Sequence, residues 1–285
     1  MTQLKIGGVP EHFNLPWHLA QKDKAFKKQN IDLQWRDFPG GTGAMCHALR
    51  NDDIDVAIIL TEGIIKDIID GNASKIIQTY VESPLVWGIH VDKDSTYRTV
   101  NDLKGTTAAI SRSGSGSHLM AYINAEQNQW DIEKDLKFNI IQDIEGALTG
   151  FKNKAVDYLL WEKFMTKPLV DNGTLRRIGN CLSPWPCFVI AARDEIIENK
   201  PEILKSLLEI INTYTRDFKD TEQIEIRISE MYNIQIEDVR SWLEITEWSQ
   251  CIMDEETISN VQRHLLQVKI IPNTIEYQSL IKKII

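Results

Sequence analysis

The residues best suited to bind a ligand form one run of serine and glycine with an arginine and a histidine, Ser111 to His118. An apolar, strand-like run (Thr106 to Ile110) precedes it, and a helix-like run (Leu119 to about Asn128) follows it. Such a loop leaves backbone N–H groups and the positive end of a helix dipole facing an open space, which suits an anion or a strongly polar group. Glycine permits close approach of a ligand, and serine hydroxyls both donate and accept hydrogen bonds.

A second loop of the same design, Phe38 to Gly43, opens a helix-like segment from Ala44 to Arg50. Neither loop is a Walker A motif, because no Lys-Ser or Lys-Thr follows the glycines. Neither is a good match to the dinucleotide fingerprint Gly-x-Gly-x-x-Gly. In the serine and glycine loop, Gly114-Ser115-Gly116 is followed by Leu119 at the position of the third glycine. Either loop alone could simply connect a strand to a helix, with serine as the N-cap. Two such loops, one in each half of the chain, predict two walls of one cleft.

Composition narrows the possible partners. The net charge of −9 and the pI near 5.3 argue against nucleic acid or an anionic membrane as the main partner. The cysteines form no CxxC pair or zinc spacing and the histidines are scattered, so we expect no metal site and no cofactor. Free cysteines fit a reducing compartment, although the sequence is also compatible with a disulfide between Cys181 and Cys187.

The first residues lead directly into an apolar strand, without a basic segment, a long apolar core or a cleavage site. No stretch has the length of a membrane span. We therefore expect a cytoplasmic protein without membrane insertion, or a periplasmic one if a signal peptide was trimmed away.

Strand-like and helix-like segments alternate along the chain, which predicts an α/β layer fold with a parallel sheet. Asp55 to Leu60 is a continuous apolar run, as expected for a strand covered on both faces. After the extended segment from Pro84 to Val91 the alternation starts again, and Asp55-Val56-Ala57 is echoed by Asp157-Tyr158-Leu159. Cys187 to Ala192 is a last apolar strand, and after it the chain becomes helical.

These patterns predict a two-lobed clamshell in which each lobe has a mixed, mostly parallel sheet flanked by helices. Lobe 1 would comprise residues 1–88 and 190–285, and lobe 2 residues 89–189. The extended segments near residues 86–91 and 187–192 would be the hinge. Ligand sites in open α/β sheets lie beyond the carboxyl ends of the strands, which is where both glycine loops fall.

The order and spacing of the motifs resemble those of type II periplasmic-binding proteins, most closely the branch that binds sulfonates, nitrate, taurine and thiamine-precursor pyrimidines. The resemblance covers nearly the whole chain. It rests on Ile6-Gly7-Gly8-Val9-Pro10, Pro39 to Gly43, Asp55-Val56-Ala57-Ile58, Asp102-Leu103-Lys104-Gly105, Ser113 to Ser117 and Glu237-Asp238-Val239.

The resemblance implies a small-molecule ligand held between the lobes by residues from both glycine loops and from other strand ends. These residues are His12, Phe13, Gly41, Thr42, Gly43, Thr61, Glu62, Ser113, Gly114, Ser115, Gly116, Ser117 and His118. Family members that serve an importer are secreted or lipid-anchored. An ABC transporter permease is therefore expected as a partner only if a signal peptide was removed.

Further candidates follow from their positions in the chain, and each has a structural alternative. Trp161 and Glu162 end a buried strand, but could be a core residue and a helix-start acid. Asp143 could be a cleft acid or an N-cap. Trp17, with Trp87 and Trp185, could stack on a flat ring or simply pack.

The two loop histidines, His12 and His118, could donate to an anion or act as acid or base near neutral pH. Either could also be a surface histidine without a role. If Glu11 and Glu62 both point inward, an amine or a heteroaromatic ring would fit better than a purely anionic ligand.

The preferred function is a solute-binding protein that closes two lobes around a small polar metabolite, anionic or heteroaromatic, such as a sulfonate, nitrate or a pyrimidine. No nucleophile elbow, metal set or triad is present in the sequence, so no catalytic residue is assigned. The alternative is a cytosolic enzyme on the same fold, a pyrimidine synthase or lyase of cofactor biosynthesis, using His12, His118, Glu62 or Cys187. The thiamine-pyrimidine synthases that the chain resembles carry a cysteine-rich cluster near the second hinge strand, where only Cys187 stands here.

Overall fold

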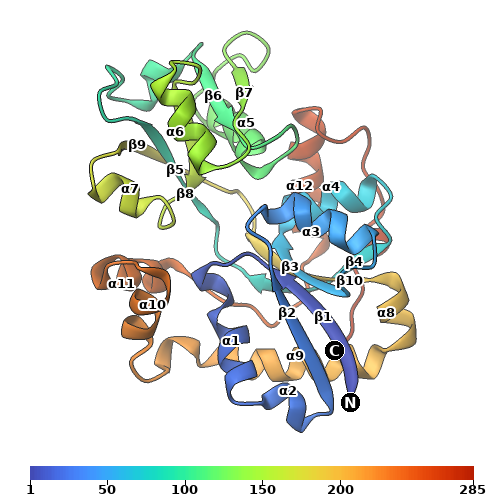
Figure 1. Ribbon diagram of the computed structural model, residues 1–285. Coiled ribbons are helices and arrows are strands. Elements are labelled where there is room, and N and C mark those ends of the chain that lie inside the picture. Colours follow the sequence, from blue (N-terminus) through green and yellow to red (C-terminus); the bar gives the residue numbers. More distant parts are fainter. The chain divides into compact units, whose positions relative to one another are not determined.

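The computed structural model describes residues 1–285 and divides into two compact units (Figure 1). Unit 1 comprises Met1–Ser83, Trp185–Leu266 and Ile271–Ile285, and unit 2 comprises Pro84–Pro184 and Gln267–Ile270. Each unit contains one five-stranded sheet. The predicted α/β fold, with two mixed sheets flanked by helices, is confirmed.

The sheet of unit 1 has the strand order β2-β1-β3-β10-β4. The strands are β1 (Thr2–Gly8), β2 (Ile31–Asp37), β3 (Val56–Leu60), β4 (Ser74–Val81) and β10 (Phe188–Arg193). β1 pairs in parallel with β2 and β3, whereas β10 is antiparallel to both β3 and β4. Residues from late in the chain therefore complete the middle of a sheet made mostly of early residues.

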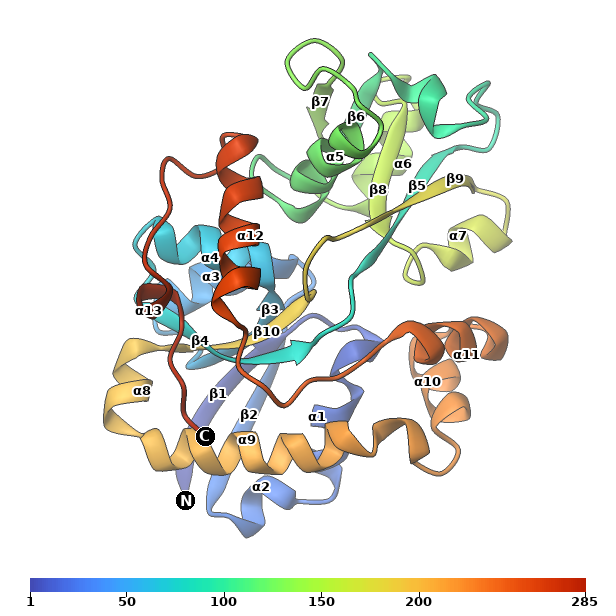
Figure 2. The same ribbon diagram turned by 180° about the vertical axis from the view of Figure 1, so that it is seen from behind.

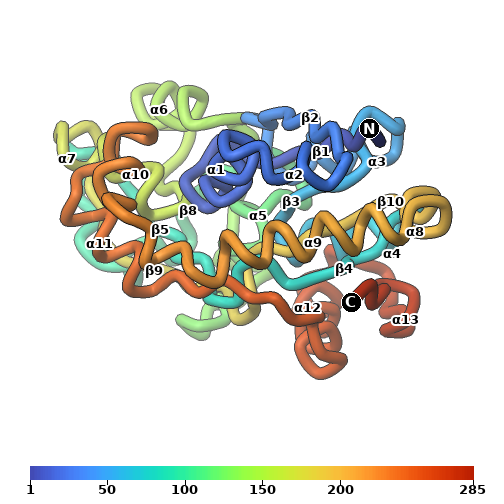
Figure 3. The backbone as a smooth tube through the Cα atoms, turned by 90° about the horizontal axis from the view of Figure 1, so that it is seen from below, coloured from blue at the N-terminus to red at the C-terminus, as the bar shows by residue number.

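Helices cover this sheet, and both chain termini belong to unit 1 (Figure 2). The longest is α9 (Pro201–Arg216), which begins with proline at its first position and buries a stripe that includes Leu204, Leu208 and Ile211. It packs against α1 (Leu15–Lys22), as Figure 3 shows from below. The other helical elements are η1 (His12–Asn14), α2 (Ala25–Lys28), α3 (Gly41–Arg50), α4 (Thr61–Ile69), α8 (Asp194–Asn199), η3 (Phe218–Asp220), α10 (Ile224–Tyr232), α11 (Ile236–Ile245), α12 (Glu255–Gln267) and α13 (Tyr277–Leu280).

Unit 2 repeats the plan, with the strand order β7-β6-β8-β5-β9. Its strands are β5 (Val86–Asp92), β6 (Thr107–Ile110), β7 (Lys137–Ile140), β8 (Tyr158–Glu162) and β9 (Leu175–Leu182). β6 is parallel to β7 and β8, and β5 is antiparallel to β8 and β9. The helices are η2 (Val100–Leu103), α5 (Gly116–Gln127), α6 (Ile144–Lys152) and α7 (Lys167–Asp171).

The aspartate that precedes a strand in both halves of the chain, Asp55 and Asp157, makes the same hydrogen bond in both units. Each aspartate directly precedes a central strand, β3 or β8, and accepts a backbone N–H from the neighbouring parallel strand at 2.8 Å. The donors are Lys5 in β1 and Thr107 in β6. A short acidic side chain at this position thus fixes the start of the same strand pair in both units.

The two extended segments predicted as a hinge form β5 and β10, which lie inside the sheets of unit 2 and unit 1 respectively. The chain passes from one unit to the other between Ser83 and Pro84 and again between Pro184 and Trp185, and later only the short segment Gln267–Ile270 returns to unit 2. None of the helices combines the length and the apolar composition that crossing a membrane requires.

Candidate functional site

The carboxyl ends of β1, β2 and β3 lie at one edge of the unit 1 sheet because these strands are parallel. β10 starts at the same edge, since Phe188 pairs with Leu60. The segments that meet there are Val9–Phe13, Phe38–Gly43, Thr61–Glu62 and Trp185–Cys187. This edge is where an α/β sheet normally offers a ligand site.

The start of α4 is hydrogen-bonded to the segment that leads into β10. The N–H of Thr61 donates to the carbonyl of Cys187 at 3.0 Å, and the Thr61 hydroxyl donates to the carbonyl of Pro186 at 2.5 Å. The indole Nε1–H of Trp185 donates to Oε2 of Glu62 at 2.9 Å. The Glu62 side chain is therefore committed to Trp185 within unit 1.

Glu62 is only 4% exposed, and burial raises the pKa of its carboxyl from 4.5 to about 7. Hydrogen bonds from its own backbone N–H and from Trp185 favour the ionised form and oppose this shift, but burial has the larger effect. The carboxyl therefore gains and loses its proton near neutral pH. An anionic ligand would not meet a fully charged Glu62 at this edge.

The glycine loop before α3 lies against the start of α4. Gly41 has a positive φ of 64°, which glycine adopts without strain, and no side chain caps the helix. The N–H of Gly41 donates to the carbonyl of Phe38 at 2.9 Å, and the N–H groups of Thr42 and Gly43 remain for water or an outside acceptor. Thr42 contacts Gly63, since a Cβ built at Gly63 would lie 2.2 Å from Cγ2 of Thr42.

Gly63→Ala is therefore expected to destabilise unit 1 by about 1–3 kcal/mol, because the added methyl group overlaps the Thr42 side chain. Urea unfolding of the full chain measures the loss. The double variant Gly63→Ala/Thr42→Ser removes the clashing Cγ2 and should recover most of it. Equal losses in the single and double variants would contradict the proposed contact.

His12 and Phe13 lie in an aromatic cluster built largely by the C-terminal helices. His12 is fully buried, and its ring centroid lies 4.8 Å from Phe13, 4.3 Å from Trp242 in α11 and 6.0 Å from Tyr232 in α10. Burial lowers the pKa of His12 to about 3, so its imidazole is neutral at physiological pH. Phe13 also accepts a hydrogen bond from the Tyr80 hydroxyl through its carbonyl, at 2.7 Å.

Trp17 belongs to the packed core of unit 1. Its ring is fully buried and stacks on Phe26, with centroids 6.0 Å apart and planes 11° apart. Trp35 and Tyr80 lie at similar distances on other sides. Trp17 has the packing role that the sequence left open as its alternative.

In unit 2 the serine and glycine loop follows β6 and leads into α5. Ser115 is the N-cap, and its Oγ accepts the N–H of His118 at 3.3 Å. Oγ of Ser117 accepts the N–H of Ser111 at 3.0 Å and lies 3.1 Å from Oγ of Ser115. Gly114 has a φ of 72°, so glycine is required at the turn. The hydroxyls therefore hold the loop in one shape.

His118 anchors the same loop from the first turn of α5. Its Nδ1 accepts the N–H of Gly114 at 3.0 Å, and its ring packs edge-on against Phe138 with centroids 4.5 Å apart. Partial burial lowers the pKa of His118, which favours the neutral imidazole that can accept this hydrogen bond at Nδ1. This side chain is thus a structural part of the loop.

Ser115→Ala is expected to lower the free energy of unfolding by about 1 kcal/mol, because α5 loses its N-cap and Ser117 loses a neighbouring hydroxyl. Chemical unfolding followed by circular dichroism measures the change. The matched control is Ser241→Ala in α11, whose hydroxyl bonds only within its own helix and faces solvent. A loss no larger than that of the control would contradict the capping role.

Two of the other predicted residues of unit 2, Asp143 and Glu162, accept hydrogen bonds from nearby backbone N–H groups. Asp143 is the N-cap of α6 and accepts the N–H of Gly146 at 2.8 Å. Oε2 of the buried Glu162 accepts the N–H groups of Phe164 and Met165 at 2.8 and 2.7 Å. Trp161 is half-buried and packs against the apolar cluster that includes Leu159.

Two features of unit 1 were missed at the sequence level. One is the bond between Trp185 and Glu62, which are 123 residues apart in the chain. The other is the burial of His12 by Tyr232 and Trp242. The only available signal was that Trp185 and Glu62 both lie next to apolar strands. No local pattern pairs them.

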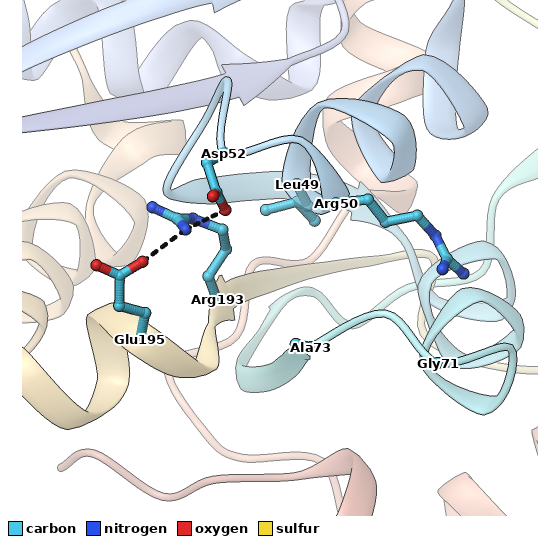
Figure 4. A pocket seen from close by; sticks show the side chains of 7 residues that line it. All are labelled: Leu49, Arg50, Asp52, Gly71, Ala73, Arg193 and Glu195. Carbon is cyan, nitrogen blue, oxygen red and sulfur yellow. Dashed lines mark hydrogen bonds and ion pairs between the residues drawn. The ribbon is translucent and has the colours of Figure 1, made fainter.

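A hollow of about 320 Å³ lies at the opposite edge of the unit 1 sheet, where β10 ends and β3 and β4 begin (Figure 4). Its charged groups are already paired: Arg193 contacts Asp52, Asp55 and Glu195, and Arg50 contacts Asp67. Leu49, Arg50, Asp52, Gly71, Ala73, Arg193 and Glu195 line it. No three side chains of the His, Cys, Asp or Glu type come together as metal ligands anywhere in the chain.

Comparisons with known proteins agree with this fold. A family model described as Ca3427-like PBP matches residues 87–181, which span β5 to β9. No match was found among curated protein sequences.

Solved structures match over nearly the full chain. The CA3427 gene product of Candida albicans, described as defining a new family with the generic periplasmic binding protein fold, has a TM-score of 0.90 at 24% identity, covering 99% of this chain and 97% of that one. The alkanesulfonate-binding protein SsuA of Xanthomonas axonopodis pv. citri, bound to MOPS, has a TM-score of 0.83 at 15% identity and covers 99% of both chains. PhnD1 of Prochlorococcus marinus, in complex with methylphosphonate, has a TM-score of 0.63 at 11% identity, covering 94% and 98%. The predicted resemblance is thus confirmed for the fold, and the chain is one of the proteins with the type II periplasmic-binding-protein fold.

Proposed function

We propose that this chain is a solute-binding protein that closes its two units around a small polar metabolite carrying an oxyanion group. The observation that carries the proposal is the loop from Ser111 to Ser117. Its hydroxyls are fixed by bonds within the loop, and Ser115 caps only the N–H of His118. The first-turn N–H groups of Gly116 and Ser117 remain as donors for a ligand at the positive end of α5.

An organic sulfonate or phosphonate is the ligand class we propose. Related folds have been described with such molecules, SsuA with MOPS and PhnD1 with methylphosphonate. A compact oxyanion offers several acceptor oxygens to donors spaced like those of a helix N-terminus. In unit 1, a neutral His12 and a Glu62 with a raised pKa leave the sheet edge weakly charged below pH 7.

The enzyme alternative has less support. His118 uses Nδ1 to hold Gly114, and Cys187 is buried with its carbonyl bonded to Thr61. Since another related fold is described as the ligand-binding component of an ABC-type import system, a permease is the partner we propose for an exported form.

Isothermal titration calorimetry with methanesulfonate, methylphosphonate and nitrate, in a buffer free of sulfonates and phosphate, tests the proposal. We expect binding of at least one probe and a smaller radius of gyration in X-ray scattering of the complex. Ser117→Ala should weaken binding roughly tenfold, because the loop that presents the N–H groups of Gly116 and Ser117 loses the hydroxyl that holds Ser111. Ser241→Ala is the control. No binding of any probe, or equal affinity of Ser117→Ala and wild type, would overturn the oxyanion site, and an unchanged radius would overturn closure.

A further inference from the structure

The second passage of the chain between the units is held on its unit 1 side by the start of α4. The passage falls between Pro184 and Trp185, and the next residues lead directly into β10. Thr61 bonds to the carbonyls of Pro186 and Cys187, and Glu62 accepts the indole N–H of Trp185. Thr61, Glu62, Trp185 and Cys187 are each at most 4% exposed. The attachment is therefore almost completely buried and includes three hydrogen bonds.

Glu62 is an ionisable side chain that bonds directly to this segment, and no cation forms an ion pair with it. From α3, Thr42 contacts the next residue, Gly63, and Sγ of Cys46 lies 3.9 Å from the Gly63 carbonyl. From α12, the ring of His264 lies 5.7 Å from that of Trp185. Within α4 itself, Lys66 is paired with Asp70 at the far end of the helix. The charge on Glu62 is thus balanced only by hydrogen bonds.

We propose that Glu62 is a positioning residue that works as a proton-controlled clamp on the Trp185–Cys187 segment. When the carboxyl is ionised, it accepts a strong, charge-assisted hydrogen bond from the Trp185 indole. When a proton from solvent binds the carboxyl, the acceptor becomes neutral and the bond weakens, while the indole keeps its own proton. The Trp185 end of the attachment then loosens, and the two Thr61 bonds remain.

Two opposing effects on the pKa of Glu62 bring the protonation of its carboxyl into the neutral pH range. Burial favours the protonated carboxyl, whereas the Trp185 bond favours the ionised one, and the resulting pKa of Glu62 is about 7. Both forms are therefore populated at neutral pH. The clamp concerns the unliganded chain and holds or fails independently of the proposed oxyanion site.

The test is NMR of the full chain labelled with ¹⁵N at its tryptophans, recorded from pH 5.5 to 8.5. Trp185→Phe assigns the Trp185 indole signal by its disappearance. We expect the Nε1–H proton of Trp185 to move downfield with a midpoint near pH 7 as Glu62 ionises. In Glu62→Gln, which keeps the shape but not the charge, this movement should vanish.

His264→Gln is the matched control, because the ring of His264 lies beside that of Trp185, with centroids 5.7 Å apart, and glutamine removes its ionisable group. The clamp predicts that His264→Gln keeps the titration and Glu62→Gln loses it. The reverse pattern would overturn the proposal, because the movement of the Trp185 signal would then not depend on Glu62. A Trp185 signal that does not move in the wild type would overturn it as well, whether or not the variants fold.

Discussion

Arg193→Met is expected to destabilise unit 1 by about 3–5 kcal/mol, the cost of leaving a buried carboxylate without its cation. The side chains of Arg193 and Asp55 are 10% and 8% exposed, and Nη2 of Arg193 lies 2.9 Å from Oδ1 of Asp55. Asp55 cannot turn to solvent without also releasing the N–H of Lys5. Guanidinium unfolding of the full chain measures the loss.

Two further variants separate the ion pair from a general effect of removing a charge. Lys66→Met breaks the more exposed pair with Asp70 and should change the free energy of unfolding by less than about 1 kcal/mol. The double variant Arg193→Met/Asp55→Asn should recover much of the loss, because no unpaired charge stays buried. An Arg193→Met loss as small as that of Lys66→Met would contradict the role of this pair.

Stability should also depend on pH through Glu62. A carboxyl whose pKa is higher in the folded state than in the unfolded state stabilises the fold fully below the unfolded value. It loses that contribution as pH rises through the folded value. With a pKa of about 7 against 4.5, the loss attributable to Glu62 is about 3 kcal/mol and occurs between about pH 4.5 and 7.

The difference between wild type and Glu62→Gln isolates this effect. Glu11 has a pKa raised in the same direction by burial, whereas His12 has one lowered to about 3, so the wild-type curve alone mixes several groups. Urea unfolding at intervals from pH 4.5 to 8 gives the difference curve. A flat difference across this range would show that Glu62 has a similar pKa in the folded and unfolded chain.

Periodicity was enough to predict the α/β class and two sheets, because buried strands such as β3 are continuous apolar runs and amphipathic helices separate them. The repeated aspartate before β3 and β8 was visible in the sequence. In both units an aspartate at this position accepts a backbone N–H from the neighbouring parallel strand. Ser115 and Asp143 could be recognised as possible N-caps for the same reason.

The contacts that decide the candidate site depend on tertiary structure instead. Trp185 meets Glu62, and Arg193 meets Asp55, only because β10 pairs with β3 over a separation of more than 100 residues. Likewise, nothing near His12 in the sequence indicates that α10 and α11 bury it. The direction of side chains at strand ends could not be predicted from the sequence either. Glu162, for example, accepts a hydrogen bond from the nearby backbone N–H of Phe164.

The placement of β10 has a consequence for how the protein is made. All five strands of unit 2 have been synthesised by Leu182, before β10 begins at Phe188. During synthesis, β3 and β4 therefore lack the strand that lies between them, while residues 84–184, which carry all five strands of unit 2, can already assemble. We expect nascent chains arrested near residue 185, with the exit tunnel bridged by a linker, to resist protease in unit 2 and to be cut in the segments of unit 1.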